Sequence, residues 1–309
     1  MNERLDAAMN RWLLDYKKNS VKAATYDRLR TSYDMMLRYM ISAKDVSAIT
    51  TDDIQKYLNR LAEEGYALST IKKQFCLLAA FMKHEYAQGR IKKPVYLSVE
   101  LPVEEVVRKP AKEMETYSQL EQRKLTKVLN TLNNRLYGAA ILMLETGMRV
   151  GETLALTWDD IDWDRRAVTI GKTLVRLSGA TNDIFVQPSP KSKSSKRTIP
   201  LSDRALDILD RLSESARGSK YVFYDNRNRG KPCTYDQLRF HLQGACKQAD
   251  VPYKGNHAFR HTFATNCYNR GCNVKVLSKL LGHADVAITY NIYIHLYGDA
   301  LDEMRKIIG

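Results

Sequence analysis

Long apolar runs and paired cysteines are both missing from this 309-residue sequence. The run at residues 139–144, one of the longest, is far shorter than the roughly 20 apolar residues that span a bilayer. The N-terminus lacks the basic-then-apolar pattern of a secretion signal. The five cysteines are odd in number and contain no C-x-x-C pair, which argues against a disulfide framework or a zinc ribbon. We therefore expect a cytoplasmic protein that has no contact with a membrane.

Internal repeats and low-complexity segments are also absent, and the length suggests two domains. What the chain has in excess is positive charge, with a net charge of +14 and a pI of about 9.4. Residues 1–100 carry 17 basic and 12 acidic side chains, a net +5 that leaves +9 for the rest. Charge spread in this way favours a polyanion partner, because Lys and Arg contacts with phosphates release counterions. A basic solvated surface without a partner is the alternative.

The first 90 residues have the spacing of helices. Two apolar faces recur at intervals of three and four residues: Leu5, Ala8, Met9, Trp12, Leu13 and Tyr16, and then Leu29, Tyr33, Met36, Leu37 and Met40. A start signal at residues 50–53 precedes a further helix, and glycines at 65 and 89 end the last two. We expect a compact domain of four helices over residues 1–90. Residues 91–116 are charged, proline-punctuated and aperiodic, which predicts a linker.

The second predicted domain covers residues 117–309. Its pattern is helical from Ser118 to about Glu145 and again towards the C-terminus. Short β signals lie between these parts, at residues 159–170, 184–186 and 198–201, and the last two flank a turn rich in Lys and Ser. The fold class expected for the whole chain is mostly α with a small antiparallel β-sheet.

Two motifs place cations beside turns. In the stretch from Thr146 to Glu152, Arg149 lies between two glycines at a helix end, and Glu152 is three residues further on, where it can orient Arg149. The turn at residues 191–197 is basic and flexible, so a Lys there can reach a phosphate or a leaving group. A surface arginine and a solvated hairpin tip are the plain alternatives.

Two further motifs carry imidazoles and tyrosines. His257 and His261 share one helix face, a spacing that can bind zinc, but the Glu of H-E-x-x-H is absent and no third ligand is evident. His257 and Arg260, one turn apart, can offer a proton-transfer group and a fixed cation. A Leu-Gly-His motif ends at His283. The tyrosines that follow it are Tyr290, Tyr293 and Tyr297, and position alone does not choose among them.

The order of these motifs is more specific than any one of them. Taken together, from about Ser118 to the end of the chain, they resemble the tyrosine recombinase (integrase) family. The motifs on which the resemblance depends are H-x-x-R-H-T at residues 257–262, L-G-H at 281–283 and T-x-x-x-Y-x-H at 289–295. The last of these motifs selects Tyr293 among the three tyrosines. The helical first part is similar, with weaker signals, to the family's SAM-like core-binding domain. Integrases of conjugative transposons and temperate phages look most similar.

The resemblance implies site-specific cleavage and rejoining of DNA through a 3′-phosphotyrosine, for excision and integration of a mobile element, without ATP, metal or cofactor. The implied roles are Tyr293 as nucleophile, Arg149 and Arg260 on the non-bridging oxygens, Lys191 as general acid, His257 in proton transfer or phosphate binding, His283 on the phosphate, and Glu152 and His295 as supports. Among the three lysines of the turn, Lys191 fits the family's usual Pro-Lys-Thr-Lys through Pro190. Lys193 is second because hairpin length varies, and Lys196 is third.

The implied partners are double-stranded DNA held in a clamp of the two domains, a homo-tetramer on two duplexes, and an accessory excision or DNA-bending protein. A C-terminal amphipathic helix at residues 299–308 packs on its own domain or, as the family suggests, on a neighbouring protomer. Many such integrases carry a further, N-terminal arm-binding domain. Because the helical pattern begins almost at Met1, we expect this chain to be either a shorter member of the family or a truncated one.

Three other functions compete with recombination. A DNA-binding regulator without catalysis predicts decay of a catalytic residue, yet every position is filled. A type IB topoisomerase shares the chemistry, but the compact size and the spacing from Leu-Gly-His to tyrosine count against it. A zinc-binding protein is the third.

Overall fold

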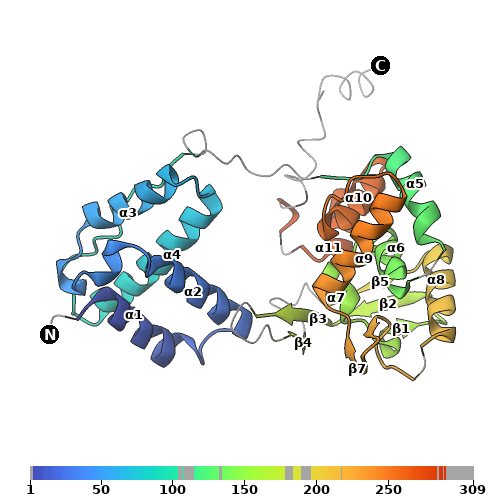
Figure 1. Cartoon of the computed structure of the whole chain (residues 1–309), viewed down its shortest axis with the longest axis horizontal. Coiled ribbons are helices and arrows are strands. Elements are labelled where there is room, and N and C mark those ends of the chain that lie inside the picture. The colour runs from blue at the N-terminus through green and yellow to red at the C-terminus, as the bar shows by residue number, and fades with distance from the viewer. Residues whose placement is uncertain are drawn as a thin grey trace, which may run out of the picture. The chain divides into compact units, whose positions relative to one another are not determined.

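The computed structural model describes residues 3–103, 107, 115–131, 134–177, 184–188, 196–216, 218–283, 285–287 and 289. The chain divides into two compact units, each with its own core (Figure 1). The first comprises residues 1–113 with 176–183, and the second comprises residues 114–175 and 184–309. None of the described helices combines the length and hydropathy needed to cross a membrane.

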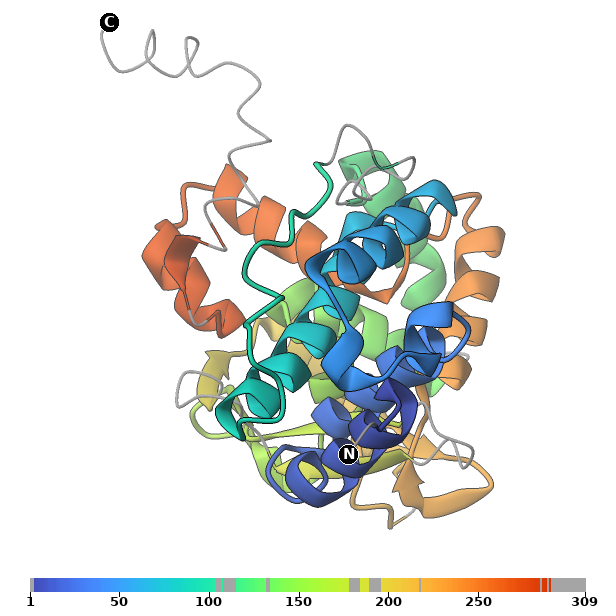
Figure 2. The same ribbon diagram turned by 90° about the vertical axis from the view of Figure 1, so that its left-hand side faces the viewer.

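The main elements of residues 3–103 in the first unit are helices, as predicted. Its α-helices, blue to teal in Figure 2, are α1 (Leu5–Trp12), α2 (Ala23–Met36), α3 (Thr51–Glu63) and α4 (Leu68–Ala87). A π-helical turn (Leu13–Lys17) continues α1, and 3-10 turns (Met40–Ala43, Val46–Ala48) precede α3. The start predicted for α3 is correct, because Thr50 and Asp53 form a capping box in which each side chain accepts a bond from the other's backbone N–H.

The ends of the predicted apolar faces are wrong at three residues, Tyr16, Leu37 and Met40, of which Leu37 is 43% exposed just after the end of α2. Tyr16 is 47% exposed, because the backbone changes from α to π geometry after Trp12 and the helical spacing no longer holds. Met40 is 91% exposed, because α2 ends at Met36. The earlier members of both faces, such as Leu5, are buried in the core of the unit.

The first part of the stretch predicted as a linker packs on this helical core. Ile91 is buried there, and Thr51 Oγ1 on α3 donates a hydrogen bond to the carbonyl oxygen of Val95 at 2.8 Å. Further along, the side-chain amide of Gln55 exchanges two hydrogen bonds with the backbone of Glu100. Apolar side chains of this stretch therefore add to the first unit's core.

The second unit is mostly helix with small sheets, which confirms the predicted fold class. The helices are α5 (Gln119–Leu129), α6 (Arg135–Thr146), α7 (Val150–Leu154), α8 (Asp203–Glu214), α9 (Tyr235–Gln248), α10 (Asn256–Asn269) and α11 (Val274–Leu281), with a 3-10 turn (Trp158–Asp160). The strands are β1 (Ile161–Asp162), β2 (Ala167–Ile170), β3 (Lys172–Arg176), β4 (Ile184–Pro188), β5 (Arg197–Pro200), β6 (Tyr224–Asp225) and β7 (Asn228–Pro232).

Strand pairing differs from the expected hairpin at the lysine-rich turn. β5 pairs antiparallel with β2, which also pairs with β1, whereas β4 pairs with β3 in a separate sheet. The strands on either side of the turn therefore belong to different sheets in the described chain. The reason lies in burial, because inward-facing Ile199 on β5 is set opposite Val168 on β2, within the core.

Helix α6 is the centre of the second unit. Its middle, residues 139–143, is fully buried, and α5, α7, α8, α9 and α10 all contact it. A helix that is apolar on every side must be covered in this way. Because α6 is held by its neighbours, the turn at its C-terminal end has a fixed position relative to α10.

Candidate active site

The Gly147 turn connects α6 to α7 and places Arg149 at the first residue before α7. Gly147 caps α6 in the left-handed conformation, with φ of +66°. A Cβ atom there would lie 2.4 Å from Cδ1 of Phe263 on α10, so only glycine fits the turn. The reversal leaves Arg149 as the N-cap residue of α7.

Glu152 holds Arg149 by both its backbone and its side chain, the contact expected from the spacing of the two residues. Its Oε2 accepts the backbone N–H of Arg149 at 2.9 Å, and its Oε1 accepts Nη1 of Arg149 at 2.9 Å. Nη2 of Arg149 donates to the carbonyl oxygen of Gly282, also at 2.9 Å. The carboxylate is 4% exposed and the arginine side chain 36% exposed. Arg149 is thus fixed from behind while part of its guanidinium remains accessible.

The Glu152 carboxylate stays ionised although it is buried. Burial by itself would raise its pKa, but hydrogen bonds and the charge of Arg197, together with Arg149, outweigh burial and lower the pKa below its usual value. Arg197 binds both carboxylate oxygens, with Nη1 to Oε1 at 3.0 Å and Nη2 to Oε2 at 2.7 Å. One carboxylate between two guanidinium groups leaves a net positive charge at this place.

Arg260 comes from α10 and is 5% exposed. Its Nη1 donates to the carbonyl oxygen of Gly147 at 2.7 Å, and its Nη2 donates to that of Leu281 at 2.7 Å. The same Nη2 lies 2.9 Å from Nε2 of His283. Arg260 therefore connects the turns that follow α6 and α11, which carry Arg149 and His283.

The protonation of His283 follows from its two partners. The imidazole comes after Gly282, the left-handed cap of α11 with φ of +65°. A guanidinium has no acceptor, so Nε2 of His283 accepts from Arg260 and the proton is on Nδ1, which donates to Thr289 Oγ1 at 2.8 Å. Burial, followed by the charges of Arg260, Arg149 and other nearby cations, lowers the pKa of His283 to about 4. The ring is neutral near pH 7.

The lowered pKa of His283 predicts a pH-dependent stability. In the unfolded chain this imidazole titrates near pH 6.5, so between there and about pH 4 the unfolded chain binds more protons than the folded one. The free energy of unfolding should therefore fall as the pH is lowered through this window. We expect the free energy of unfolding of His283→Asn to fall less steeply than that of wild type between about pH 7 and about pH 4.5, as measured by urea titrations. Contributions from other groups cancel in the comparison, and parallel curves for the two proteins would contradict the prediction.

His257 and His261 share one face of α10, with ring centroids 6.4 Å apart. Burial, then the charges of Arg260 and Arg149, lowers the pKa of His257. Burial, followed by His257 and Arg260, lowers the pKa of His261 to about 4. Within the described ranges, no group of three His, Cys, Asp or Glu side chains is arranged to hold a metal ion. Both rings are therefore neutral near pH 7, beside the charge of Arg260.

The structure thus brings together the predicted residues Arg149, His257, Arg260 and His283. The other predicted residues, Lys191, Lys193, Tyr293 and His295, lie outside the described residues. Lys196 is exposed immediately before β5. Two residues that the site contains, Arg197 at the end of the basic turn and Thr289 at the start of the Tyr293 frame, were part of sequence motifs but had been given no role in the site. The alternation on β5 was the available signal for Arg197, because that residue shares the inward face with buried Ile199.

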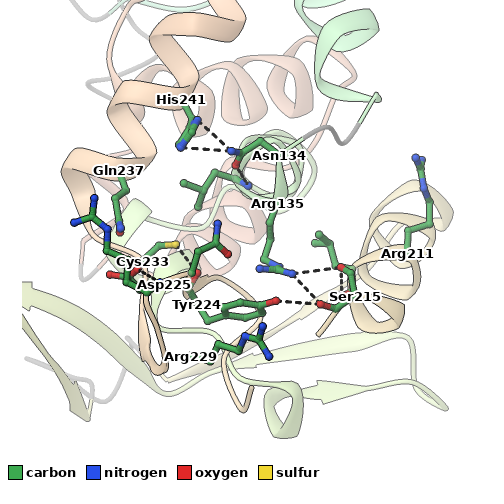
Figure 3. Close-up of a pocket in the computed structure, with 14 residues that line it drawn as sticks. Asn134, Arg135, Arg211, Ser215, Tyr224, Asp225, Arg229, Cys233, Gln237 and His241 are labelled. Atoms are coloured by element: carbon green, nitrogen blue, oxygen red, sulfur yellow. Dashed lines mark hydrogen bonds between the residues drawn. The ribbon is translucent and has the colours of Figure 1, made fainter. Parts of the chain in front are cut away.

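A cavity of about 770 Å³ lies at the other end of α6, and it contains none of these residues (Figure 3). There the guanidinium of Arg135 stacks on the ring of Tyr224 at 3.6 Å and donates to the carbonyl oxygen of Ser215 at 2.9 Å. The 12 residues of α6 separate this cavity from the Gly147 turn by roughly 18 Å at 1.5 Å per residue. The predicted site is the cluster around Glu152 and not this cavity.

The chain matches models of two protein families. Residues 117–299, more than half of the chain, match the phage integrase family, and residues 5–62 match the N-terminal SAM-like domain of phage integrases. A tyrosine recombinase XerC-like protein of Caldanaerobacter subterraneus subsp. tengcongensis is 28% identical over 93% of this chain and 78% of its own length.

Solved structures show the same fold. The Tn1549 transposon integrase in complex with transposon right end DNA has a TM-score of 0.81 at 19% identity, covering 99% of this chain and all of that one. The lambda integrase tetramer bound to a Holliday junction has a TM-score of 0.67 at 20% identity, covering 94% of this chain and 77% of that one. The family match over residues 117–299 identifies the chain as a member of the phage integrase family, the tyrosine recombinases, which are enzymes that cleave and rejoin DNA.

Proposed function

We propose that this recombinase excises and integrates a mobile element, a conjugative transposon or a phage, through a 3′-phosphotyrosine formed by Tyr293. The similarity to the Tn1549 and lambda integrases supports this kind of element. The observation that carries the proposal is the convergence of Arg149, Arg260 and His283, through Glu152 and the Gly282 turn, in a chain of this family.

The two arginines suit the stabilisation of a phosphate in reaction. Their guanidinium groups stay charged at every relevant pH and bind oxygens in a forked geometry. Their bonds to Glu152 and to backbone carbonyl oxygens hold them in place before DNA arrives. Charge that is already positioned stabilises the extra negative charge of a pentacoordinate transition state without reorganisation.

Proton transfer completes the proposed reaction. The phenol oxygen of Tyr293 forms a bond to phosphorus while the bond from phosphorus to the 5′-oxygen breaks. The phenolic proton passes to His257, whose lowered pKa keeps the ring neutral and able to accept it. Lys191 supplies a proton to the leaving 5′-oxygen. His283 binds the same phosphate through its Nδ1–H, which then exchanges Thr289 Oγ1 for a phosphate oxygen. Rejoining runs these steps in reverse with a 5′-hydroxyl from the partner duplex.

The wider assembly is proposed from the same relationship. Residues 1–90 are the core-binding domain, residues 91–116 a linker and residues 117–309 the catalytic domain, which together clamp double-stranded DNA in the cytoplasm. Four copies act on two duplexes, as the lambda integrase tetramer on a Holliday junction suggests. The C-terminal helix predicted for residues 299–308, which lie outside the described residues, packs on its own domain or on a neighbouring copy. An accessory excision or DNA-bending protein sets the direction of the reaction.

The test is to map covalent cleavage on DNA that carries the regions flanking the gene. We expect denaturation-resistant protein–DNA adducts at two discrete positions, staggered between the strands, in buffer with EDTA and without ATP. Binding without adducts would show a regulator instead. Equal relaxation of supercoiled plasmids with and without the flanking regions would show a topoisomerase.

A further inference from the structure

Arg197 begins β5 and points into the second unit instead of towards solvent. Its side chain is 6% exposed, beside the inward-facing Ile199. A buried guanidinium is costly unless its N–H groups find acceptors. Three hydrogen bonds of Arg197 reach two segments that carry residues of the proposed active site.

The first of these segments is the start of α7. Arg197 forms a two-bond fork with the carboxylate of Glu152, through Nη1 at 3.0 Å and Nη2 at 2.7 Å. The same two oxygens accept the backbone N–H and the Nη1 of Arg149, both at 2.9 Å. The plane of the carboxylate, and with it the direction of Arg149, is therefore fixed from the opposite side by Arg197.

The second segment is the end of α11. Nε of Arg197 donates to the carbonyl oxygen of Leu280 at 2.5 Å. A Cβ atom at Gly282 would lie 3.0 Å from Nη1 of Arg197, so the Gly282 turn rests directly on the guanidinium. The carbonyl oxygen of Gly282 in turn accepts Nη2 of Arg149, and His283 follows it. Arg197 thus contacts both groups that orient Arg149.

We infer that Arg197 is a positioning residue for the cleavage step, acting on Arg149 through Glu152 and through the Gly282 turn. This inference rests on the proposed role of Arg149 at the reacting phosphate. Loss of the fork leaves Glu152 free to rotate with Arg149 and removes the support beneath Gly282. A displacement of about 1 Å at a catalytic group costs on the order of 100-fold in rate.

The test compares single-turnover strand cleavage on a nicked suicide substrate by wild type, Arg197→Met and Arg197→Lys. We expect Arg197→Met to cleave on the order of 100-fold more slowly and to bind the same DNA within about threefold of wild type. Arg197→Lys keeps the charge but not the fork, so its cleavage rate should lie between those of wild type and Arg197→Met. If Arg197→Met does not fold, as judged by circular dichroism, the lysine variant carries the test with an expected loss of about tenfold.

A second substrate separates positioning from general damage. In a methylphosphonate a neutral methyl group replaces one charged oxygen of the cleaved phosphate, so cleavage depends less on Arg149. The defect of the Arg197 variant should shrink at least about tenfold on this substrate, whereas partial unfolding would slow both substrates equally. The matched control is Arg204→Met, because Arg204 also joins two segments by an ion pair, with Glu145 at 3.1 Å, and its bonds to Glu145 and Asn130 involve none of the proposed site residues.

Each outcome has a defined reading. A wild-type protein that forms no adduct contradicts the proposed function itself. An active wild type with Arg197→Met or Arg197→Lys within threefold of its rate, or slowed equally on both substrates, overturns the positioning role alone. A selective rescue on the methylphosphonate supports it.

Discussion

Tyr293→Phe is expected to abolish covalent attachment of the protein to DNA. The substitution removes the phenol oxygen that, in the proposed mechanism, forms the bond to phosphorus. Removing a nucleophile of this kind typically lowers the rate by on the order of 10⁴–10⁶. The measurement is the yield of protein–DNA adduct on a nicked suicide substrate, resolved under denaturing conditions, with DNA binding measured alongside and expected to be unchanged.

The neighbouring tyrosines provide the controls for this prediction. Tyr290→Phe and Tyr297→Phe make the same chemical change three residues before and four residues after Tyr293. Both should retain adduct formation within about tenfold of wild type, because neither is the nucleophile. If Tyr293→Phe still forms adduct and one of the other variants does not, the assignment from the Thr289-to-His295 frame is wrong.

Lys191→Ala is expected to slow cleavage by on the order of 10²–10⁴, the usual contribution of a general acid. The alkoxide that leaves from the 5′ position is a strong base, so bond breaking without a proton donor is slow. In a substrate with sulfur in place of the bridging 5′-oxygen, the leaving group is a thiolate, which needs no proton. On that substrate Lys191→Ala should cleave at nearly the wild-type rate, measured as single-turnover strand cleavage.

The same turn supplies the comparison variants. Lys193→Ala and Lys196→Ala remove one positive charge each from the same basic stretch. Both should be slowed to a similar, small extent on the oxygen and sulfur substrates, as expected for weakened phosphate contacts alone. If the sulfur substrate restores cleavage by Lys193→Ala and not by Lys191→Ala, the general acid is Lys193.

Local patterns predicted the helical parts of the chain and the start of α3, and failed where distant residues decide. The capping box of Thr50 and Asp53 is local, and α3 starts where it predicts. The lysine-rich turn was expected to close a hairpin, yet β4 pairs with β3 and β5 with β2. Strand partners are chosen by which faces are buried together, which no short window of sequence contains.

By itself the sequence determined the kinds of residue available and their order: an arginine after a glycine turn, a histidine and an arginine one helical turn apart, and a Leu-Gly-His motif. These identify the family because their chemistry and spacing are specific. Only the tertiary structure decided how they meet. Arg149 and His283 are distant in the chain, and they converge because α6 is buried beside α10 and because Arg260 bonds to the turns after both α6 and α11. The basic turn contained Arg197 without indicating its role, since that role depends on Glu152 and Leu280, which long-range packing brings to it.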